Sequence, residues 1–76
     1  MYELVDYLVG AFVDKSDYEL MVIEDGDNVE IKVIVNQDVI TSVIGKGGKI
    51  ARSIRTIVRS AGQKLDKNYT VSIEER

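Results

Sequence analysis

The sequence predicts an α+β fold of six elements in the order α-β-β-α-α-β, with a three-stranded mixed sheet covered on one face by three helices. Apolar residues recur at three- and four-residue steps in residues 2–14 and 50–61, which indicates amphipathic helices. They alternate with polar residues in residues 29–36 and 69–74, which indicates strands. The length of 76 residues predicts one domain spanning residues 1–76.

The first helix is predicted over residues 2–14. Glu3 and Asp6 lie in its first turns, where the helix macrodipole favours negative charge. We expect the apolar stripe of this helix to pack on the core, because its acidic polar face is a poor match for a membrane surface. The stripe comprises Leu4, Leu8, Ala11 and Phe12, with Val5 alongside.

Two strands, residues 18–25 and 29–36, are predicted to form a hairpin, because Asp25-Gly26 is a typical signal for a tight turn. The last strand returns through two helices, so we expect it to lie parallel to the second strand by a right-handed crossover. The second strand alternates cleanly and predicts one buried face. This face comprises Val29, Ile31, Val33 and Val35.

A short helix is predicted from Val39 to Ile44, with Asp38 as its N-cap. A long helix is predicted to begin near Gly48 and to stop at Gly62, because glycine commonly follows the last turn of a helix. We expect the arginines of this helix to lie roughly opposite its apolar face. The apolar face comprises Ile50, Ile54, Ile57, Val58 and Ala61, and the arginines are Arg52, Arg55 and Arg59.

Charge is strongly segregated along the chain. Residues 1–44 carry ten acidic and two basic residues, whereas residues 45–64 carry six basic residues and no acidic one. The formal net charge of -3 therefore conceals a basic segment that a polyanion would meet, because local potential steers association more than net charge does. The alternative explanation is a solvated basic helix face that is balanced by acidic neighbours.

The segment Ile44-Gly45-Lys46-Gly47-Gly48 predicts a tight basic turn between the two helices. Gly45 can adopt the left-handed conformation that ends a helix, and Gly48 has no side chain to block a ligand. The unpaired amides and the macrodipole at the start of the following helix favour a phosphate oxygen. Lys46 and Lys49 add two charges there. A purely structural turn is the alternative.

This segment resembles the Ile-Gly-x-x-Gly signature of KH domains, which clamp the backbone of about four single-stranded nucleotides. The element order resembles the type II KH fold over essentially the whole chain. With this loop and with Ile54-Arg55-Thr56 after it, the chain is similar to the small bacterial KH-domain RNA-binding proteins, the KhpA/YlqC family. The resemblance implies a cytoplasmic RNA-binding protein and RNA chaperone. It also implies a larger KH-containing partner of the KhpB/Jag type and a link to cell shape and peptidoglycan homeostasis.

The same resemblance implies which residues contact single-stranded RNA. The glycine turn would contact phosphates, apolar residues of the short helix would lie beneath the bases, and two lysines near the last strand would form an opposite wall. We expect Ile44 to belong to the core more than to contact a base. The implied residues are Gly45, Lys46, Gly47, Gly48, Lys49, Arg52, Ile40, Val43, Ile44, Lys64 and Lys67.

No catalytic site, metal site or cofactor is predicted. The chain contains no histidine and no cysteine, which removes the commonest general base and the usual metal ligands. The P-loop pattern fails at Ile40 and Gly47, and the dinucleotide-binding glycine pattern fails at Ile50. An enzyme is therefore not expected.

No segment approaches the roughly 20 apolar residues of a membrane span, and the acidic N-terminal residues do not resemble a signal peptide. We therefore expect a cytoplasmic protein with no membrane partner. The alternative function is a protein-interaction module that forms a homodimer through its acidic half or its short helix and has little affinity for RNA.

Overall fold

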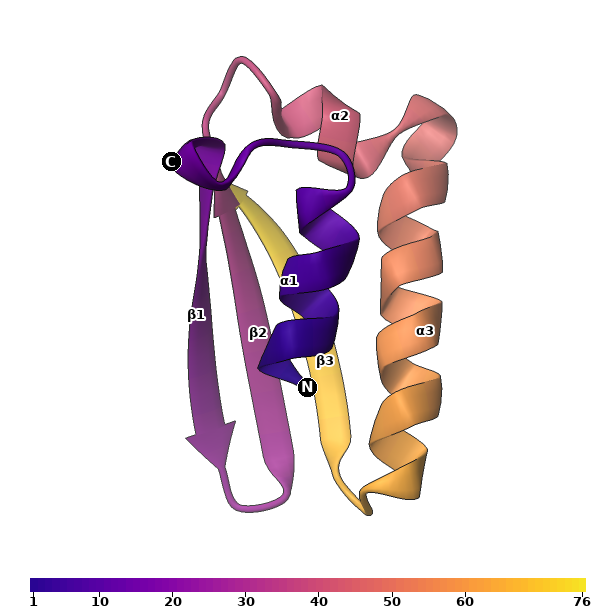
Figure 1. Cartoon of the computed structure of the whole chain (residues 1–76). Helices are drawn as coiled ribbons and strands as arrows, with labels where there is room; N and C mark the ends of the chain where they lie inside the picture. The colour runs from indigo at the N-terminus through magenta and orange to yellow at the C-terminus, as the bar shows by residue number, and fades with distance from the viewer.

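The computed structural model describes all 76 residues and confirms the predicted α+β fold (Figure 1). Three strands and three α-helices follow one another in the predicted order, with a 3-10 turn before the first strand and another between the second and third helices. The elements are α1 (Tyr2–Gly10), η1 (Lys15–Asp17), β1 (Tyr18–Asp25), β2 (Asn28–Val35), α2 (Ile40–Ile44), η2 (Lys46–Gly48), α3 (Lys49–Lys64) and β3 (Asn68–Glu75).

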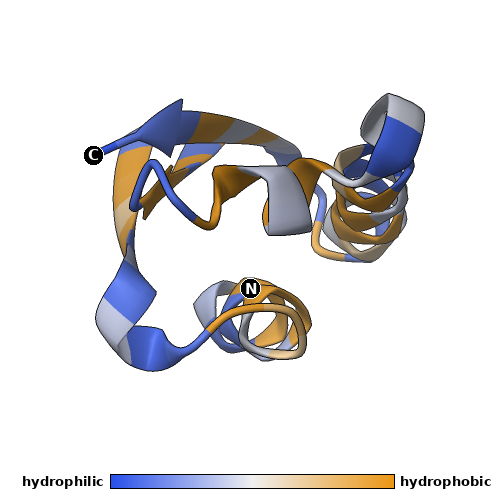
Figure 2. Ribbon diagram, turned by 90° about the horizontal axis from the view of Figure 1, so that it is seen from above, coloured by the Kyte–Doolittle hydropathy of each residue, from blue (hydrophilic) through white to orange (hydrophobic).

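The sheet has the strand order β1-β2-β3, so β2 is central. β1 pairs antiparallel with β2, with Tyr18 opposite Val35, and β3 pairs parallel with β2, with Val35 opposite Glu75. The helices lie on one face of the sheet, as the view from above shows (Figure 2). α3 descends beside β3, so the turn η2 and the loop after α3 lie at opposite ends of the molecule (Figure 1).

The hydrophobic core lies between the sheet and the helical layer. The alternating residues of β2 form its floor, and none of the four is more than 3% exposed. Complete burial of an aliphatic side chain contributes about 1.5–3 kcal/mol, so this strand supplies much of the stability. The core residues of β2 and of the helical layer are Val29, Ile31, Val33, Val35, Val5, Val9, Val13, Val43, Ile54 and Val58.

The first helix differs from its prediction in length and in its buried face. α1 ends at Gly10, so Ala11 and Phe12 lie beyond the helix and are exposed. Val5, which the prediction placed alongside the leucine stripe, is fully buried together with Val9, so the face that packs on the sheet is shifted toward these valines. Leu4 and Leu8 are only partly buried, and Val13 is buried in the segment that follows the helix.

The prediction that Gly62 ends the long helix is wrong, because α3 continues to Lys64. Gly62 is instead packed against β3: a Cβ there would lie 2.7 Å from Cδ2 of Tyr69 and 3.1 Å from the carbonyl oxygen of Lys67. The missing side chain lets the chain turn back closely beside the helix. The buried face of α3 is also rotated from the prediction, because Ala51 is buried and Ile57 is 43% exposed.

The predicted N-cap of the short helix is also wrong. α2 begins at Ile40, and Val39 occupies the N-cap position without a side-chain hydrogen bond. Asp38 therefore lies in the preceding turn. This leaves α2 as a five-residue helix held by its neighbours, since a helix this short has little stability of its own.

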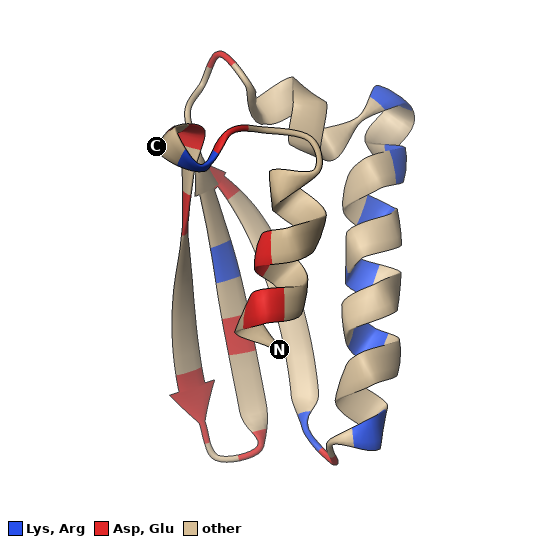
Figure 3. Ribbon diagram, in the orientation of Figure 1, with Lys and Arg blue, Asp and Glu red and all other residues tan.

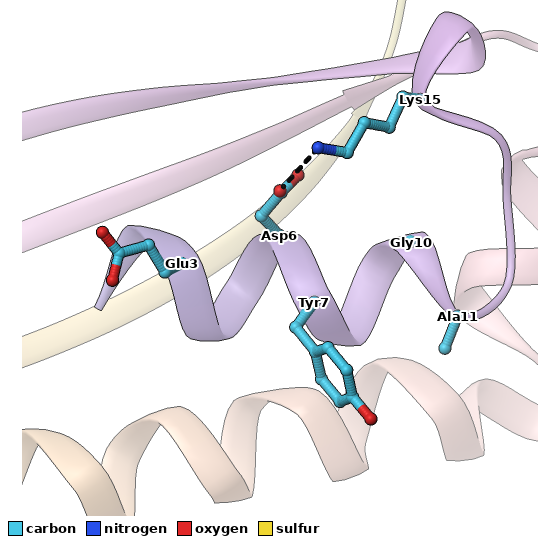
Figure 4. Close-up of a pocket in the computed structure, with 6 residues that line it drawn as sticks. All are labelled: Glu3, Asp6, Tyr7, Gly10, Ala11 and Lys15. Carbon is cyan, nitrogen blue, oxygen red and sulfur yellow. Dashed lines mark ion pairs between the residues drawn. The ribbon is translucent and has the colours of Figure 1, made fainter.

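Polar contacts hold α1 to the start of β1. The Tyr18 hydroxyl donates a hydrogen bond to Oδ1 of Asp6 at 2.7 Å, and Nζ of Lys15 lies 3.4 Å from Oδ2 of the same residue (Figure 4). The hydrogen bond from Tyr18 lowers the pKa of the Asp6 carboxyl, and burial raises the pKa of Tyr18 to about 12. Asp6 is thus held charged and Tyr18 neutral at neutral pH.

Candidate nucleic-acid interface

Three glycines shape the turn between α2 and α3. Gly45, Gly47 and Gly48 all have positive φ, at 77°, 65° and 79°. Gly45 combines this φ with a ψ of 171°, a region that essentially only glycine adopts, and is therefore not in the predicted left-handed helical conformation. The amide of Gly48 donates to the carbonyl of Gly45 at 3.1 Å, which closes the turn. Side-chain-bearing residues rarely adopt such angles, so the glycines are required by the backbone.

The glycines differ in what surrounds them. A Cβ on Gly45 would lie 2.7 Å from Cγ1 of Ile50, so this position is closed by packing. A Cβ on Gly47 or Gly48 would meet no atom within 4 Å. The first glycine therefore fixes the turn onto α3, whereas the other two leave open space in which a ligand can approach the backbone.

The electrostatics of the turn favour an anion. Gly48 is the N-cap of α3, and no side chain caps the amides of the first turn. These amides and the macrodipole give that end of the helix partial positive charge. Lys46 and Lys49 are exposed beside it. Figure 3 shows basic residues along α3, whereas acidic residues lie mainly on α1 and on the strands.

Two arginines of α3 make contacts that the sequence did not predict. Nη2 of Arg52 donates to the carbonyl oxygen of Gly47 at 2.8 Å, and Nε of Arg55 donates to the carbonyl oxygen of Val71 at 3.2 Å. The predicted orientation opposite the core is therefore wrong for Arg55, which reaches across to β3. Arg59 is exposed two turns of helix after Arg52, on the same side.

A signal for the Arg55 contact was present in the sequence. Arg55 and Gly62 are seven residues apart, about two turns of helix. They therefore share one side of α3. Tyr69 of β3 packs closely against Gly62 on that side of the helix. A glycine within the predicted helix therefore indicated which side faces the strand. The prediction that Gly62 ends the helix did not include this packing against β3.

The predicted apolar residues are divided between the core and the surface. Val43 is fully buried, so it belongs to the core and offers no surface to a base; its predicted place beneath the bases is wrong. Ile44, which we expected in the core, is 37% exposed at the turn. Ile40 is partly buried. The apolar surface near the turn therefore comes from Ile44 and from part of Ile40.

Lys64 and Lys67 lie far from the glycine turn. The 16 residues of α3 span about 24 Å, and Lys64 is the last of them (Figure 1). Nζ of Lys67 lies 3.8 Å from Oε2 of Glu24 on β1, so its charge is partly engaged within the protein. The structure gathers Lys46, Lys49 and Arg52 around the turn but does not bring these two lysines to the same place.

Hollows in the surface lie elsewhere and carry no arrangement for catalysis. One hollow of about 500 Å³ lies beside α1, where Tyr7 and the Asp6–Lys15 ion pair line it (Figure 4). No group of three or more acidic residues, histidines or cysteines is arranged to hold a metal ion. None of the helices combines the length and the hydrophobicity that a transmembrane span requires.

Comparison with known proteins gives a consistent family. The family model described as "KhpA/KhpB, KH domain" matches residues 2–73. A protein named RNA-binding protein KhpA from Listeria monocytogenes is 36% identical over 76 residues, 99% of this chain and 100% of the relative. Proteins of the same name from Caldanaerobacter subterraneus and Borreliella burgdorferi are 38% and 33% identical over 96% and 93% of this chain, and 99% and 88% of the relatives. These names describe binding proteins and not enzymes.

Proposed function

This chain belongs to the KhpA/KhpB KH-domain family, and from that premise we propose that it binds single-stranded RNA through the turn Gly45–Gly48. The observation that carries the proposal is the geometry of that turn. Two glycines with positive φ stand in open space at an uncapped helix start. Two exposed lysines flank them.

Phosphate is the chemical group that this turn suits best. Backbone amides at a helix start point toward an anion, and the dipole adds to the attraction. Without side chains on Gly47 and Gly48, a phosphate can approach the backbone of the turn closely. We therefore assign phosphate binding to the turn, with Lys46 and Lys49 as the nearest charges.

The bases would lie over the surface between the first turns of α3 and β3. Ile44 and the accessible part of Ile40 offer apolar contact there. No aromatic residue occurs from Gly45 to Asn68, so stacking platforms like those of other single-strand binders are not expected. Lys64 and Lys67 remain candidate contacts only for an RNA that continues along the whole of α3.

The biological setting follows from the family and extends the proposal. We infer that the chain acts in the cytoplasm as an RNA chaperone, with a larger KH-containing protein of the KhpB/Jag type as its partner and with an influence on cell shape and peptidoglycan homeostasis. The family description, which joins KhpA and KhpB, supports this partner class. We treat residues 1–76 as one KH domain.

Exposed apolar residues on α3 and directly after it favour association as a second, compatible function. Ile57 and Leu65 are 43% and 54% exposed, and a shallow hollow beside them is lined also by Ala61. Pairing two KH domains would raise avidity for RNA through effective concentration. We expect wild-type protein to self-associate or to pair with another KH protein, and Ile57→Lys to weaken this association. Sedimentation velocity over a concentration series measures it; a wild-type protein that stays monomeric and captures no KH partner would contradict it.

The test of RNA binding reverses the charge of the turn. We predict that Lys46→Asp combined with Gly47→Asp abolishes binding, because two carboxylates would stand where phosphate is held. Both positions are exposed, and aspartate tolerates positive φ better than most residues, so the fold should survive. Gel-shift titration with single-stranded RNA measures the affinity, and circular dichroism checks the fold.

The control is Lys64→Asp, which reverses one charge at the far end of the same helix and should bind a short single-stranded RNA of about four nucleotides nearly as well as wild type. Duplex RNA of the same sequence should bind worse, because its bases are paired and its grooves differ in shape. Undiminished binding by the folded double variant would refute the site.

A further inference from the structure

We propose that Arg52 is a positioning residue: it fixes the conformation of the Gly47–Gly48 backbone before RNA arrives, and does not itself bind phosphate. The proposal rests on the proposed function of the turn and assigns a new role within it. Its observation is the hydrogen bond from Nη2 of Arg52 to the carbonyl oxygen of Gly47 at 2.8 Å.

The turn needs such a contact because of its composition. Gly45, Gly47 and Gly48 occupy three of its four positions, and glycine loses more conformational freedom on ordering than any other residue. Gly45 is held by Ile50, but a Cβ on either of the other two would meet nothing. Packing therefore restrains only the first glycine, and the far side of the turn depends on hydrogen bonds.

Three hydrogen bonds define that far side, one of them from the amide of Lys49 to the carbonyl of Lys46. The amide of Gly48 donates to the carbonyl of Gly45, and the guanidinium of Arg52 holds the carbonyl of Gly47. This last bond also directs the negative end of that peptide group toward Arg52. A carbonyl oxygen that is held in this direction cannot rotate toward an incoming phosphate, which would repel it.

Ordering the turn in the free protein increases affinity for RNA. A ligand that must order a loop loses part of its binding free energy, and a loop already ordered removes that cost. The bond is exposed, so its net contribution is modest. A typical exchange of a protein hydrogen bond for water predicts a loss of about threefold to tenfold in affinity when it is removed.

The other arginines of α3 provide matched controls. Arg55 is bonded to β3 and Arg59 has no hydrogen bond or ion pair within the chain, so neither restrains the turn. Arg59 shares the side of the helix and the charge of Arg52. Arg59→Gln therefore removes the same charge without touching the turn.

The experiment compares wild type, Arg52→Gln, Arg52→Lys and Arg59→Gln in two measurements. Amide relaxation and hydrogen exchange by NMR report the mobility of Gly47 and Gly48 in RNA-free protein. Titration of a short labelled oligouridine at several salt concentrations reports affinity and its salt dependence. We expect Arg52→Gln to mobilise both glycines and to weaken binding about threefold to tenfold with an unchanged salt slope, and Arg59→Gln to leave the glycines rigid.

Each other outcome overturns the proposal in a defined way. A salt slope that falls by about 0.7 in Arg52→Gln means that Arg52 contacts a phosphate itself. Glycines that stay rigid in Arg52→Gln mean that the bond does not order the turn. Arg52→Lys retains the positive charge, so the proposal requires its RNA affinity to fall if Gly47 and Gly48 become mobile. If this variant has mobile glycines and still binds RNA with wild-type affinity, the charge alone is sufficient and the proposal is wrong. The mobility measurement needs no RNA, so it still decides the role of Arg52 if wild type fails to bind.

Discussion

The two ends of α3 contain the same kinds of residue and use them in opposite ways. At the first end, Gly47 and Gly48 have positive φ and face open space. At the last end, Gly62 lies within the helix and is pressed against Tyr69 and the backbone of Lys67. The first two glycines leave the backbone of the turn exposed, whereas Gly62 lets a neighbouring strand pack closely against the helix.

The lysines show the same contrast. Lys46 and Lys49 form no ion pair within the chain and stand beside an uncapped helix start. Lys67 is paired with Glu24, and Lys64 lies at the helix end where the macrodipole is negative. A positive charge at the first end therefore adds to the field of the helix, whereas at the last end it is offset. Residue type alone does not assign a binding role; the surrounding backbone and charges do.

The largest expected effect is on stability at the last end of α3. We predict that Gly62→Val lowers the free energy of unfolding by about 3 kcal/mol, because the new side chain overlaps Tyr69 and the Lys67 carbonyl. Urea unfolding followed by circular dichroism measures the change. The RNA affinity of the folded fraction should be unchanged, because the turn at the other end is not disturbed.

Gly48→Ala is the matched substitution at the first end. Its Cβ meets no atom, so only the positive φ costs stability, by about 1 kcal/mol. Its RNA affinity should fall, because the methyl group stands where the backbone is open. If Gly62→Val and Gly48→Ala lowered the free energy of unfolding equally and bound RNA equally well, the contrast between the two ends of α3 would be wrong.

An intermediate effect is expected in the salt dependence of RNA binding. About two or three phosphate contacts at the turn predict a slope of log K against log salt of roughly -1.5 to -2. Titrations of single-stranded RNA at several salt concentrations measure it. A much steeper slope would indicate that the RNA interface extends along the arginines of α3 toward Lys64. Both ends of α3 would then contact RNA.

The smallest expected effect on RNA binding comes from Asp6, which lies far from both ends. Its pKa is lowered in the folded protein by the Tyr18 hydrogen bond. The resulting stability is present above the ordinary pKa of about 4 and is lost as pH falls through the lowered value. Asp6→Asn should therefore be less stable than wild type at neutral pH and should lose less stability on acidification, with unchanged RNA affinity.

Tyr18 provides the corresponding test at alkaline pH. Its pKa is raised to about 12, so the unfolded chain ionises first, and stability should fall as pH rises from about 10 through about 12. Urea unfolding at acidic and at alkaline pH measures the stability changes predicted for Asp6 and for Tyr18. A flat acid profile in wild type would show that the Asp6–Tyr18 contact does not stabilise α1 on the sheet.

Local patterns in the sequence determined the element order, the strand hairpin and the buried face of β2. Each depends on neighbours in sequence: alternation predicts which side of a strand is buried, and Asp25-Gly26 predicts its turn. The glycine turn was also predictable, because its residues are contiguous and glycine is needed where φ is positive.

Tertiary structure decided which face of each helix is buried and what each glycine does. A helix that is apolar over a broad arc can pack in more than one rotation, so the sequence pattern did not determine that Val9 is fully buried while Leu4 and Leu8 are only partly buried. The packing role of Gly62 is visible only in the tertiary structure, where Tyr69 lies directly against it. The contact of Arg55 joins the helix to Val71, 16 residues further along the chain, and depends on how β3 packs beside α3. The contact of Arg52 with Gly47 spans only five residues and depends on the conformation of the glycine turn. The sequence therefore determined the glycine turn with its flanking lysines, because these residues are contiguous, whereas the packing of α3 against β3 determined that Arg55 bonds to the strand.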